Sequence, residues 1–193
     1  MGYKNREIES KLVVKGRQGG PVVNMRNVDK VLDRAFEDET KDYVEGTSND
    51  TYWRAPSGAQ ADFGRVREMS SGRCMLTAKG KDKGDNLDRI EVDLDVLGTS
   101  LQVIKFMENL LGTSGGTVRK TYGVYVLENE HTTVSLYRVH GDDRVFVEVE
   151  ARTKKRMLQM EEKVKKHLLE GGFDSERVEK SLFEMFVAKK ELR

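Results

Sequence analysis

Charged and neutral side chains alternate in a short run near the start of the chain, Glu7-Ile8-Glu9-Ser10-Lys11. Side chains alternate between the two faces of a β-strand, so this run as a strand would direct two carboxylates and one amine to the same face. Three charges are costly in an ordinary apolar core, and they become useful where a wet cavity holds something charged. The run therefore predicts a strand that lines a binding site for a charged ligand.

The same alternation recurs in three later runs. They are Arg65-Val66-Arg67, Arg89-Ile90-Glu91-Val92-Asp93-Leu94-Asp95 and Glu148-Val149-Glu150. Carboxylates that share one strand face, such as those of Glu148 and Glu150, repel each other unless a cation lies between them. A hard divalent ion, Mg²⁺ or Mn²⁺, prefers oxygen ligands, and Arg and Lys side chains beside it suit phosphate oxygens. A metal ion with a polyphosphate is therefore the simplest ligand for these residues.

Strand-sized runs bounded by turn residues account for most of the chain and place these charges in a sheet. We expect strands at about residues 6–14, 51–54, 62–68, 74–79, 87–96, 117–127, 132–139 and 144–150, with a loop at 37–49. Amphipathic helices are expected after an N-cap at Asn27, after a cap at Thr99 or Ser100, and at residues 151–170 and 175–190.

The two faces of most expected strands differ sharply, which indicates how the sheet is arranged. Aliphatic side chains occupy the face opposite the charges, and the four amphipathic helices are available to cover it. The sheet then closes with its charged face inward. The predicted fold class is α+β: an eight-stranded antiparallel closed β tunnel with a charged lumen, covered outside by amphipathic helices.

Size and composition limit the classes of function. The chain has 193 residues, of which 37% are hydrophobic, and its 34 basic and 33 acidic residues leave a formal charge of +1. This balance provides no global field that would attract nucleic acid or an anionic membrane, so neither is expected as a partner. The single cysteine, Cys74, cannot form an internal disulfide, and no signal peptide or membrane span is evident, so a cytoplasmic protein is expected. The oligomeric state stays open, with a homodimer as one option.

The charged runs resemble, in type and order, the motifs of the CYTH family, the triphosphate tunnel metalloenzymes. The EIESK run fits the ExExK signature of that family. Five further segments are similar, in order, to its second strand, its paired-basic strand, its lysine strand, its RxExE strand (with Asp93 in place of the last Glu) and its closing FxEIE strand. They are residues 50–53, 63–68, 76–80, 89–93 and 146–150. The resemblance implies that residues 1–193 form a single CYTH-like triphosphate tunnel domain, with C-terminal helices of residues 150–193 packed on it.

The resemblance also implies roles for individual residues. The implied ligands of one or two Mg²⁺ or Mn²⁺ ions are Glu7, Glu9, Glu91, Glu148 and Glu150. The implied triphosphate-binding residues are Lys11, Arg65, Arg67, Lys79, Arg89 and Lys120, and the implied catalytic set is Glu7, Glu9, Lys11, Glu148 and Glu150. The chain departs from the family pattern at Tyr137, where relatives tend to have an acid, and at Tyr122, where a second basic residue is expected.

Members of the family include inorganic triphosphatases, thiamine-triphosphatases, RNA triphosphatases and class IV adenylyl cyclases. The favoured interpretation is metal-dependent hydrolysis of inorganic triphosphate, a nucleoside triphosphate or another organic triphosphate, in which a metal-polarised water attacks the terminal phosphorus. The alternative is an adenylyl cyclase. Members of that branch carry a His-Phe pair just before ExExK, where this chain has Met1-Gly2-Tyr3. A third interpretation is a non-catalytic module that binds polyphosphate or nucleotide.

Overall fold

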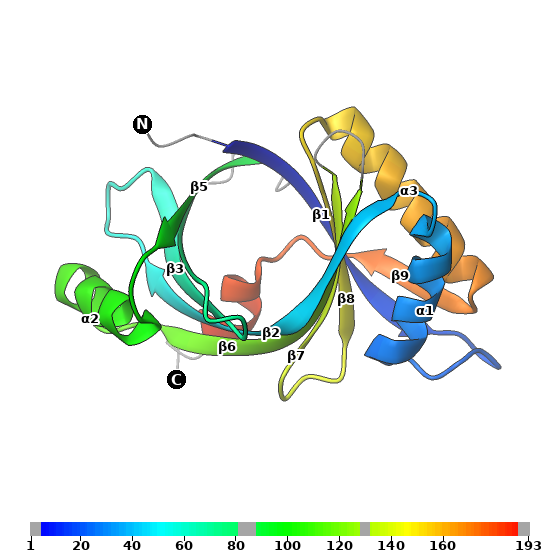
Figure 1. The fold of residues 1–193 in the computed structure, drawn as a ribbon, viewed down its shortest axis with the longest axis horizontal. Helices are drawn as coiled ribbons and strands as arrows, with labels where there is room; N and C mark the ends of the chain where they lie inside the picture. Colours follow the sequence, from blue (N-terminus) through cyan, green and yellow to red (C-terminus); the bar gives the residue numbers. More distant parts are fainter. Residues whose placement is uncertain (1–4, 81–87, 128–131, 189–193) are drawn as a thin grey trace. The chain divides into compact units, whose positions relative to one another are not determined.

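The computed structural model describes the backbone of residues 5–80, 88–127 and 132–188, and the side chains of residues 8–80, 91–127 and 132–188. Within these ranges the chain forms nine strands, three α-helices and one π-helical turn (Figure 1). The elements are β1 (Asn5–Gly16), α1 (Met25–Phe36), β2 (Thr40–Arg54), β3 (Ala61–Met69), β4 (Cys74–Gly80), β5 (Asp88–Val96), α2 (Ser100–Leu111), β6 (Gly116–Leu127), β7 (Thr133–Val139), β8 (Val145–Ala151), α3 (Lys154–Glu170), β9 (Phe173–Arg177) and η1 (Phe183–Val187). The predicted α+β class with an antiparallel sheet is confirmed.

The chain divides into two compact units. Of the described residues, unit 1 comprises 5–6, 46–80, 88–119 and 180–188, and unit 2 comprises 7–45, 120–127 and 132–179. Hydrogen-bonded strands follow the order β5-β4-β3-β2-β6 in unit 1 and β2-β6-β7-β8-β1-β9 in unit 2. Strands β2 and β6 appear in both orders because each contributes residues to both units. The single domain and the closed tunnel stay predictions.

Helix α2 covers the apolar face of the unit 1 strands. Its first turn is capped by Thr99, as predicted: the Thr99 hydroxyl accepts a hydrogen bond from the backbone N–H of Gln102, whose side chain accepts one from the N–H of Thr99. The helix ends at Gly112, where φ is +82°. Its inward side completes a buried cluster of Trp53, Val66, Cys74, Val103 and Met107.

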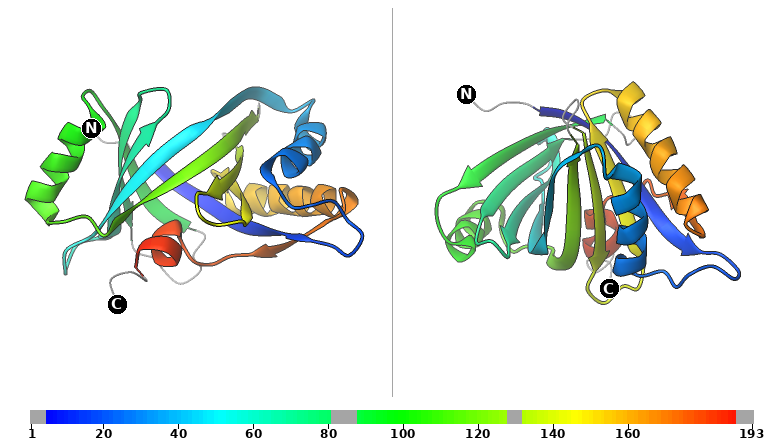
Figure 2. Two further views of the ribbon diagram at one scale, coloured as in Figure 1. Left: turned by 90° about the horizontal axis from the view of Figure 1, so that it is seen from below. Right: turned by 45° about the vertical axis from the view of Figure 1, so that its right-hand side comes forward.

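Helices α1 and α3 pack side by side on the apolar face of unit 2, against β7 and β8 (Figure 2, right). The buried side chains of this layer come from both helices and from three strands; they include Leu12, Val28, Leu32, Leu136, Val147, Val149, Met157, Met160, Val164 and Leu168. Burying one such side chain contributes about 1.5–3 kcal/mol, so this layer holds the unit together. The prediction that helices cover the aliphatic strand faces is confirmed in each unit.

Over the described residues, no helix has both the length and the apolar character needed to cross a bilayer.

The loop predicted at residues 37–49 is wrong, because β2 already begins at Thr40. Residues 41–45 are exposed, so this part of the strand carries no apolar alternation. These residues form a strand despite the low strand propensity of their polar side chains.

The helix predicted at residues 175–190 is also wrong. Residues 173–177 form β9, a ninth strand that pairs antiparallel with Leu12–Gly16 of β1, and only Phe183–Val187 are helical, as η1.

Two of the predicted helices begin at other residues than expected. Helix α1 begins at Met25 with Asn24 as its cap, whose side chain accepts a hydrogen bond from the N–H of Asn27, and α3 begins at Lys154 because Ala151 still belongs to β8.

Candidate functional site

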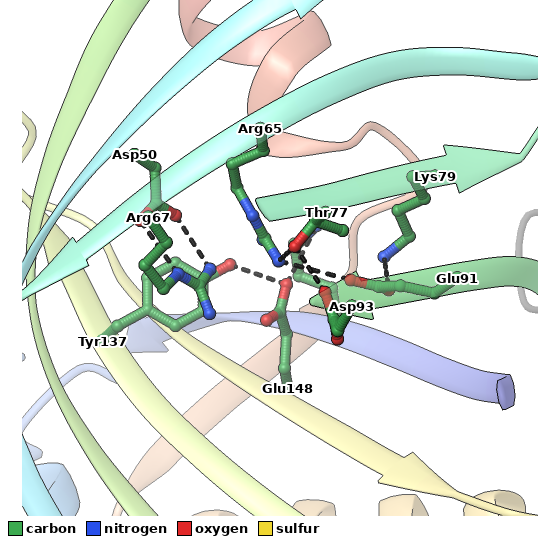
Figure 3. Close-up of polar contacts among 10 residues, drawn as sticks. Asp50, Arg65, Arg67, Thr77, Lys79, Glu91, Asp93, Tyr137 and Glu148 are labelled. Carbon is green, nitrogen blue, oxygen red and sulfur yellow. Dashed lines mark hydrogen bonds and ion pairs between the residues drawn. The ribbon is translucent and has the colours of Figure 1, made fainter. Parts of the chain in front are cut away.

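The strand register of unit 1 gathers the predicted basic residues on one face of its sheet. Arg65 lies opposite Thr77 of β4, and Lys79 lies opposite Glu91 of β5. Arg67 lies opposite Asp50 of β2. These residues are spaced two apart along their strands, so their side chains share a face. We refer to this set as the basic face: Asp50, Arg65, Arg67, Thr77, Lys79, Glu91 and Asp93 (Figure 3).

Glu91 lies between two cations of the basic face. Its Oε1 is 3.2 Å from Arg65 Nη2, and its Oε2 is 3.2 Å from Lys79 Nζ. The residue is only 5% exposed, and burial by itself would raise its pKa. The charges of Lys79 and Arg65 outweigh burial and hold the pKa of Glu91 below its ordinary value. Glu91 is therefore an ionised counter-ion that fixes both cations in place.

Arg67 forms a second buried ion pair, with Asp50. Its Nε and Nη2 donate to the two carboxylate oxygens at 2.9 and 2.8 Å, and the Asp50 side chain is fully buried. Burial works against the charged guanidinium, but Asp50 more than compensates and raises the pKa of Arg67. This pair holds the guanidinium plane in one orientation.

Thr77 links Arg65 to a third carboxylate. Arg65 Nη2 donates to Thr77 Oγ1 at 2.9 Å, and that hydroxyl donates to Asp93 Oδ1 at 2.5 Å. Asp93 is exposed, and Asp95 two residues later pairs instead with Arg73. The basic face therefore alternates cations with carboxylates, and each of its three described cations has an acidic partner.

The register of unit 2 brings together the predicted residues of β1 and β8. Lys11 lies opposite Glu148, and Lys11 Nζ is 3.1 Å from Glu148 Oε1. Glu9 lies opposite Glu150, whose Oε2 accepts a hydrogen bond of 3.0 Å from Thr133 of β7. We refer to Glu9, Lys11, Lys120, Tyr137, Glu148 and Glu150 as the acidic face.

The opposed carboxylates of Glu9 and Glu150 suit a divalent cation. Among the described residues, no three His, Cys, Asp or Glu side chains gather closely enough to enclose a metal. Mg²⁺ is usually held by one or two carboxylates together with phosphates of a substrate, and Glu9 with Glu150 fits that mode.

Lys120 and Tyr137 complete the acidic face. Lys120 is 6% exposed, and its Nζ lies over the Tyr137 ring, 5.1 Å from the centroid. The Tyr137 hydroxyl donates to Glu148 Oε1 at 2.9 Å (Figure 3). The side chains of Glu7 and Arg89, two predicted site residues, lie outside the described side chains.

Sequence reasoning missed two polar partners on the basic face. Asp50 lies two residues before Tyr52, and Thr77 lies two residues before Lys79, so each pair shares one strand face. Both could have been found by extending the alternation of the charged residues to every polar residue on the same strand face.

Comparison with family models finds no match, and no curated protein matches the chain. Solved structures do match. A conserved hypothetical protein from Pyrococcus furiosus has 21% identity and a TM-score of 0.67, with 93% of this chain and 99% of that one covered. A candidate adenylate cyclase from Vibrio parahaemolyticus has 15% identity and a TM-score of 0.65, with 96% and 100% covered.

A third similar structure is a candidate adenylyl cyclase from Hippeastrum, described as having a dominant triphosphatase activity. It shares 16% identity and a TM-score of 0.61, over 93% of this chain and 94% of that one. The chain shares its fold with these proteins, in agreement with the resemblance to the CYTH family. At these identities the likeness concerns the fold alone.

Proposed function

We propose that the chain is a divalent-metal-dependent triphosphatase that hydrolyses inorganic triphosphate, a nucleoside triphosphate or another organic triphosphate. The observation that carries the proposal is the basic face, where the side chains of Arg65, Arg67 and Lys79 are only 12%, 19% and 11% exposed. Arginine and lysine side chains gathered on one strand face suit the oxygens of a polyphosphate. The likeness to a protein with triphosphatase activity supports the same substrate class.

The basic face would bind phosphate oxygens. The Arg65 and Arg67 guanidinium groups are planar donors that suit phosphate, and Lys79 adds a compact positive charge. Their ion pairs with Glu91 and Asp50 orient them before any ligand arrives. Part of the binding energy would then be spent in displacing Glu91 from Arg65 and Lys79. Arg89 is a further proposed phosphate ligand.

The acidic face would hold the metal and the attacking water. The proposed metal ligands on this face are Glu7, Glu9, Glu148 and Glu150. When bound, Mg²⁺ or Mn²⁺ supplies positive charge that polarises the water and stabilises the leaving phosphate oxygens. Lys11 and Lys120 add positive charge for the phosphates, and Lys11 also neutralises Glu148 before metal binds. No protein nucleophile is needed.

Adenylyl cyclase activity is the second candidate, because a similar structure is described as a candidate adenylate cyclase. A cyclase would bind the same metal and phosphates but direct the 3′-hydroxyl of ATP to the α-phosphorus. Incubation with ATP and Mn²⁺ separates the two, since a cyclase releases pyrophosphate with cyclic AMP and a hydrolase releases orthophosphate with ADP.

The test is a product assay over inorganic triphosphate, ATP and thiamine triphosphate, each with Mg²⁺ and with Mn²⁺. The proposal expects metal-dependent orthophosphate release from at least one of them. Cyclic AMP without orthophosphate would establish the cyclase instead. Tight metal-dependent binding of triphosphate without any product would establish a binding module.

A further inference from the structure

Tyr137 is held rigidly on the acidic face of unit 2. It is 1% exposed, and its ring stacks on Phe146 of β8 with centroids 5.4 Å apart and an interplanar angle of 17°. Lys120 Nζ lies over the ring, 5.1 Å from its centroid, which adds a cation–π contact. The ring therefore has little freedom to move, and the position of its hydroxyl is set by packing.

The hydroxyl is directed at a proposed metal ligand. It donates to Glu148 Oε1 at 2.9 Å, and Lys11 Nζ is 3.1 Å from the same oxygen. The two donors come from β7 and β1, the strands on either side of β8. Two donors that converge on one oxygen from opposite sides restrict rotation of the carboxylate.

We propose that Tyr137 is a positioning residue, which holds the Glu148 carboxylate in the orientation that metal binding requires. This inference rests on the proposed function. Tyr137 makes no contact with the reacting atoms in this account; it acts through Glu148. The phenol of Tyr137 donates a hydrogen bond to Glu148, whereas a carboxylate at this position would add another negative charge. The acidic face therefore relies on the orientation of its acids and not on an additional acid.

Tyr137→Phe tests the proposal because phenylalanine keeps the ring stacking and the contact with Lys120. Mn²⁺ binding, followed by the electron paramagnetic resonance signal of free Mn²⁺, should weaken about tenfold, near the lower end of what a hydrogen bond to a charged group contributes. The value of kcat should fall by a similar factor. The KM for triphosphate at saturating Mn²⁺ should change less than twofold.

Tyr122→Phe is the matched control. Tyr122 lies directly opposite Tyr137 on β6 and is half-buried on the same face, and in the part of the chain that the structure describes its hydroxyl makes no hydrogen bond. Removing that hydroxyl should leave Mn²⁺ binding within twofold of the unmodified protein. Equal Mn²⁺ affinity in the two variants would overturn the proposal.

A double-mutant cycle separates positioning from a general loss of structure. If Tyr137 acts through Glu148, then Tyr137→Phe should weaken Mn²⁺ binding no further in a Glu148→Gln background. A full tenfold further loss would show that Tyr137 acts independently of Glu148 and would refute the inference. Absence of both Mn²⁺ binding and turnover in the unmodified protein would refute the proposed function as well, whereas a normal parent with an unaffected Tyr137→Phe variant refutes this inference alone.

Discussion

Asp50 and Arg67 form a two-bond ion pair, at 2.9 and 2.8 Å, in which the carboxylate has no exposed surface. The pair between Arg73 and Asp95 has the same geometry, at 2.7 and 2.8 Å, but both of its side chains are more than half exposed. Unit 1 thus contains one buried and one exposed version of the same interaction, which separates the effect of burial from that of geometry.

Asp50→Asn should destabilise the protein by about 3 kcal/mol, because it leaves the buried Arg67 guanidinium without its counter-charge. Asp95→Asn is the control and should change stability much less than Asp50→Asn does, since exposed pairs are screened by solvent. Urea unfolding measures both. Equal losses of stability in the two variants would show that burial of the Asp50 pair has no special effect.

Arg65→Ala should raise the KM for triphosphate about tenfold or more, because a charge-assisted contact to a phosphate is lost. Arg73→Ala removes the same type of side chain from an exposed position in unit 1 and should leave KM unchanged. Steady-state kinetics at saturating Mn²⁺ make the comparison. An unchanged KM in Arg65→Ala would remove Arg65 from the phosphate-binding set.

Glu161 of α3 should make stability depend on acid pH. Burial would raise the pKa of this 2% exposed carboxyl, but hydrogen bonds from Arg177, at 2.5 Å, and from Lys165, at 2.6 Å, outweigh burial and lower it. A lowered pKa in the folded state adds stability above the unfolded-state pKa of about 4.3, and this stability is lost as the pH falls through the folded-state value.

The measurement is the free energy of unfolding between pH 7 and pH 3 for the unmodified protein and for Glu161→Gln. The variant should be less stable at pH 7 by about 2 kcal/mol, and the difference should narrow below about pH 4. A constant difference over the whole range would contradict the assignment.

Metal removal should stop turnover without unfolding the protein. Lys11 already pairs with Glu148, and Arg65 and Lys79 pair with Glu91, so charges on both faces have partners before a metal binds. Treatment with EDTA should abolish phosphate release and leave the circular dichroism spectrum of the folded protein unchanged, and added Mn²⁺ should restore activity. Activity that survives EDTA would contradict the proposed mechanism.

Much of the fold follows from the alternation of side chains along the strands. Arg65-Val66-Arg67 fixes which face of β3 is apolar, and α2 covers that face because its own apolar side matches it. Strand β9 escaped prediction because its strand structure comes from backbone pairing with β1. The first half of β2 escaped prediction because its residues 41–45 are exposed and show no apolar alternation.

The candidate site could be predicted in its composition but not in its pairings. Alternation places Glu148 and Lys11 on charged strand faces, and the register of β1 with β8 then sets them opposite each other. The contact of Tyr137 with Glu148 is diagonal across β7 and β8, so it depends on side-chain orientation as well as register. Sequence patterns carry no information about such orientation, which packing of the Tyr137 ring decides.

The most direct test of the central claim is orthophosphate release from the preferred triphosphate as Mn²⁺ is titrated, for the unmodified protein, Glu150→Gln and Glu176→Gln. Glu176 is an exposed acid of β9 that pairs with Lys15, so it serves as the control. We expect metal-dependent release that Glu176→Gln retains. Glu150→Gln should lower it by at least about a hundredfold, the scale on which one electrostatic catalytic group acts. Equal release by Glu150→Gln, or none by the unmodified protein with any of the triphosphates, would contradict that claim.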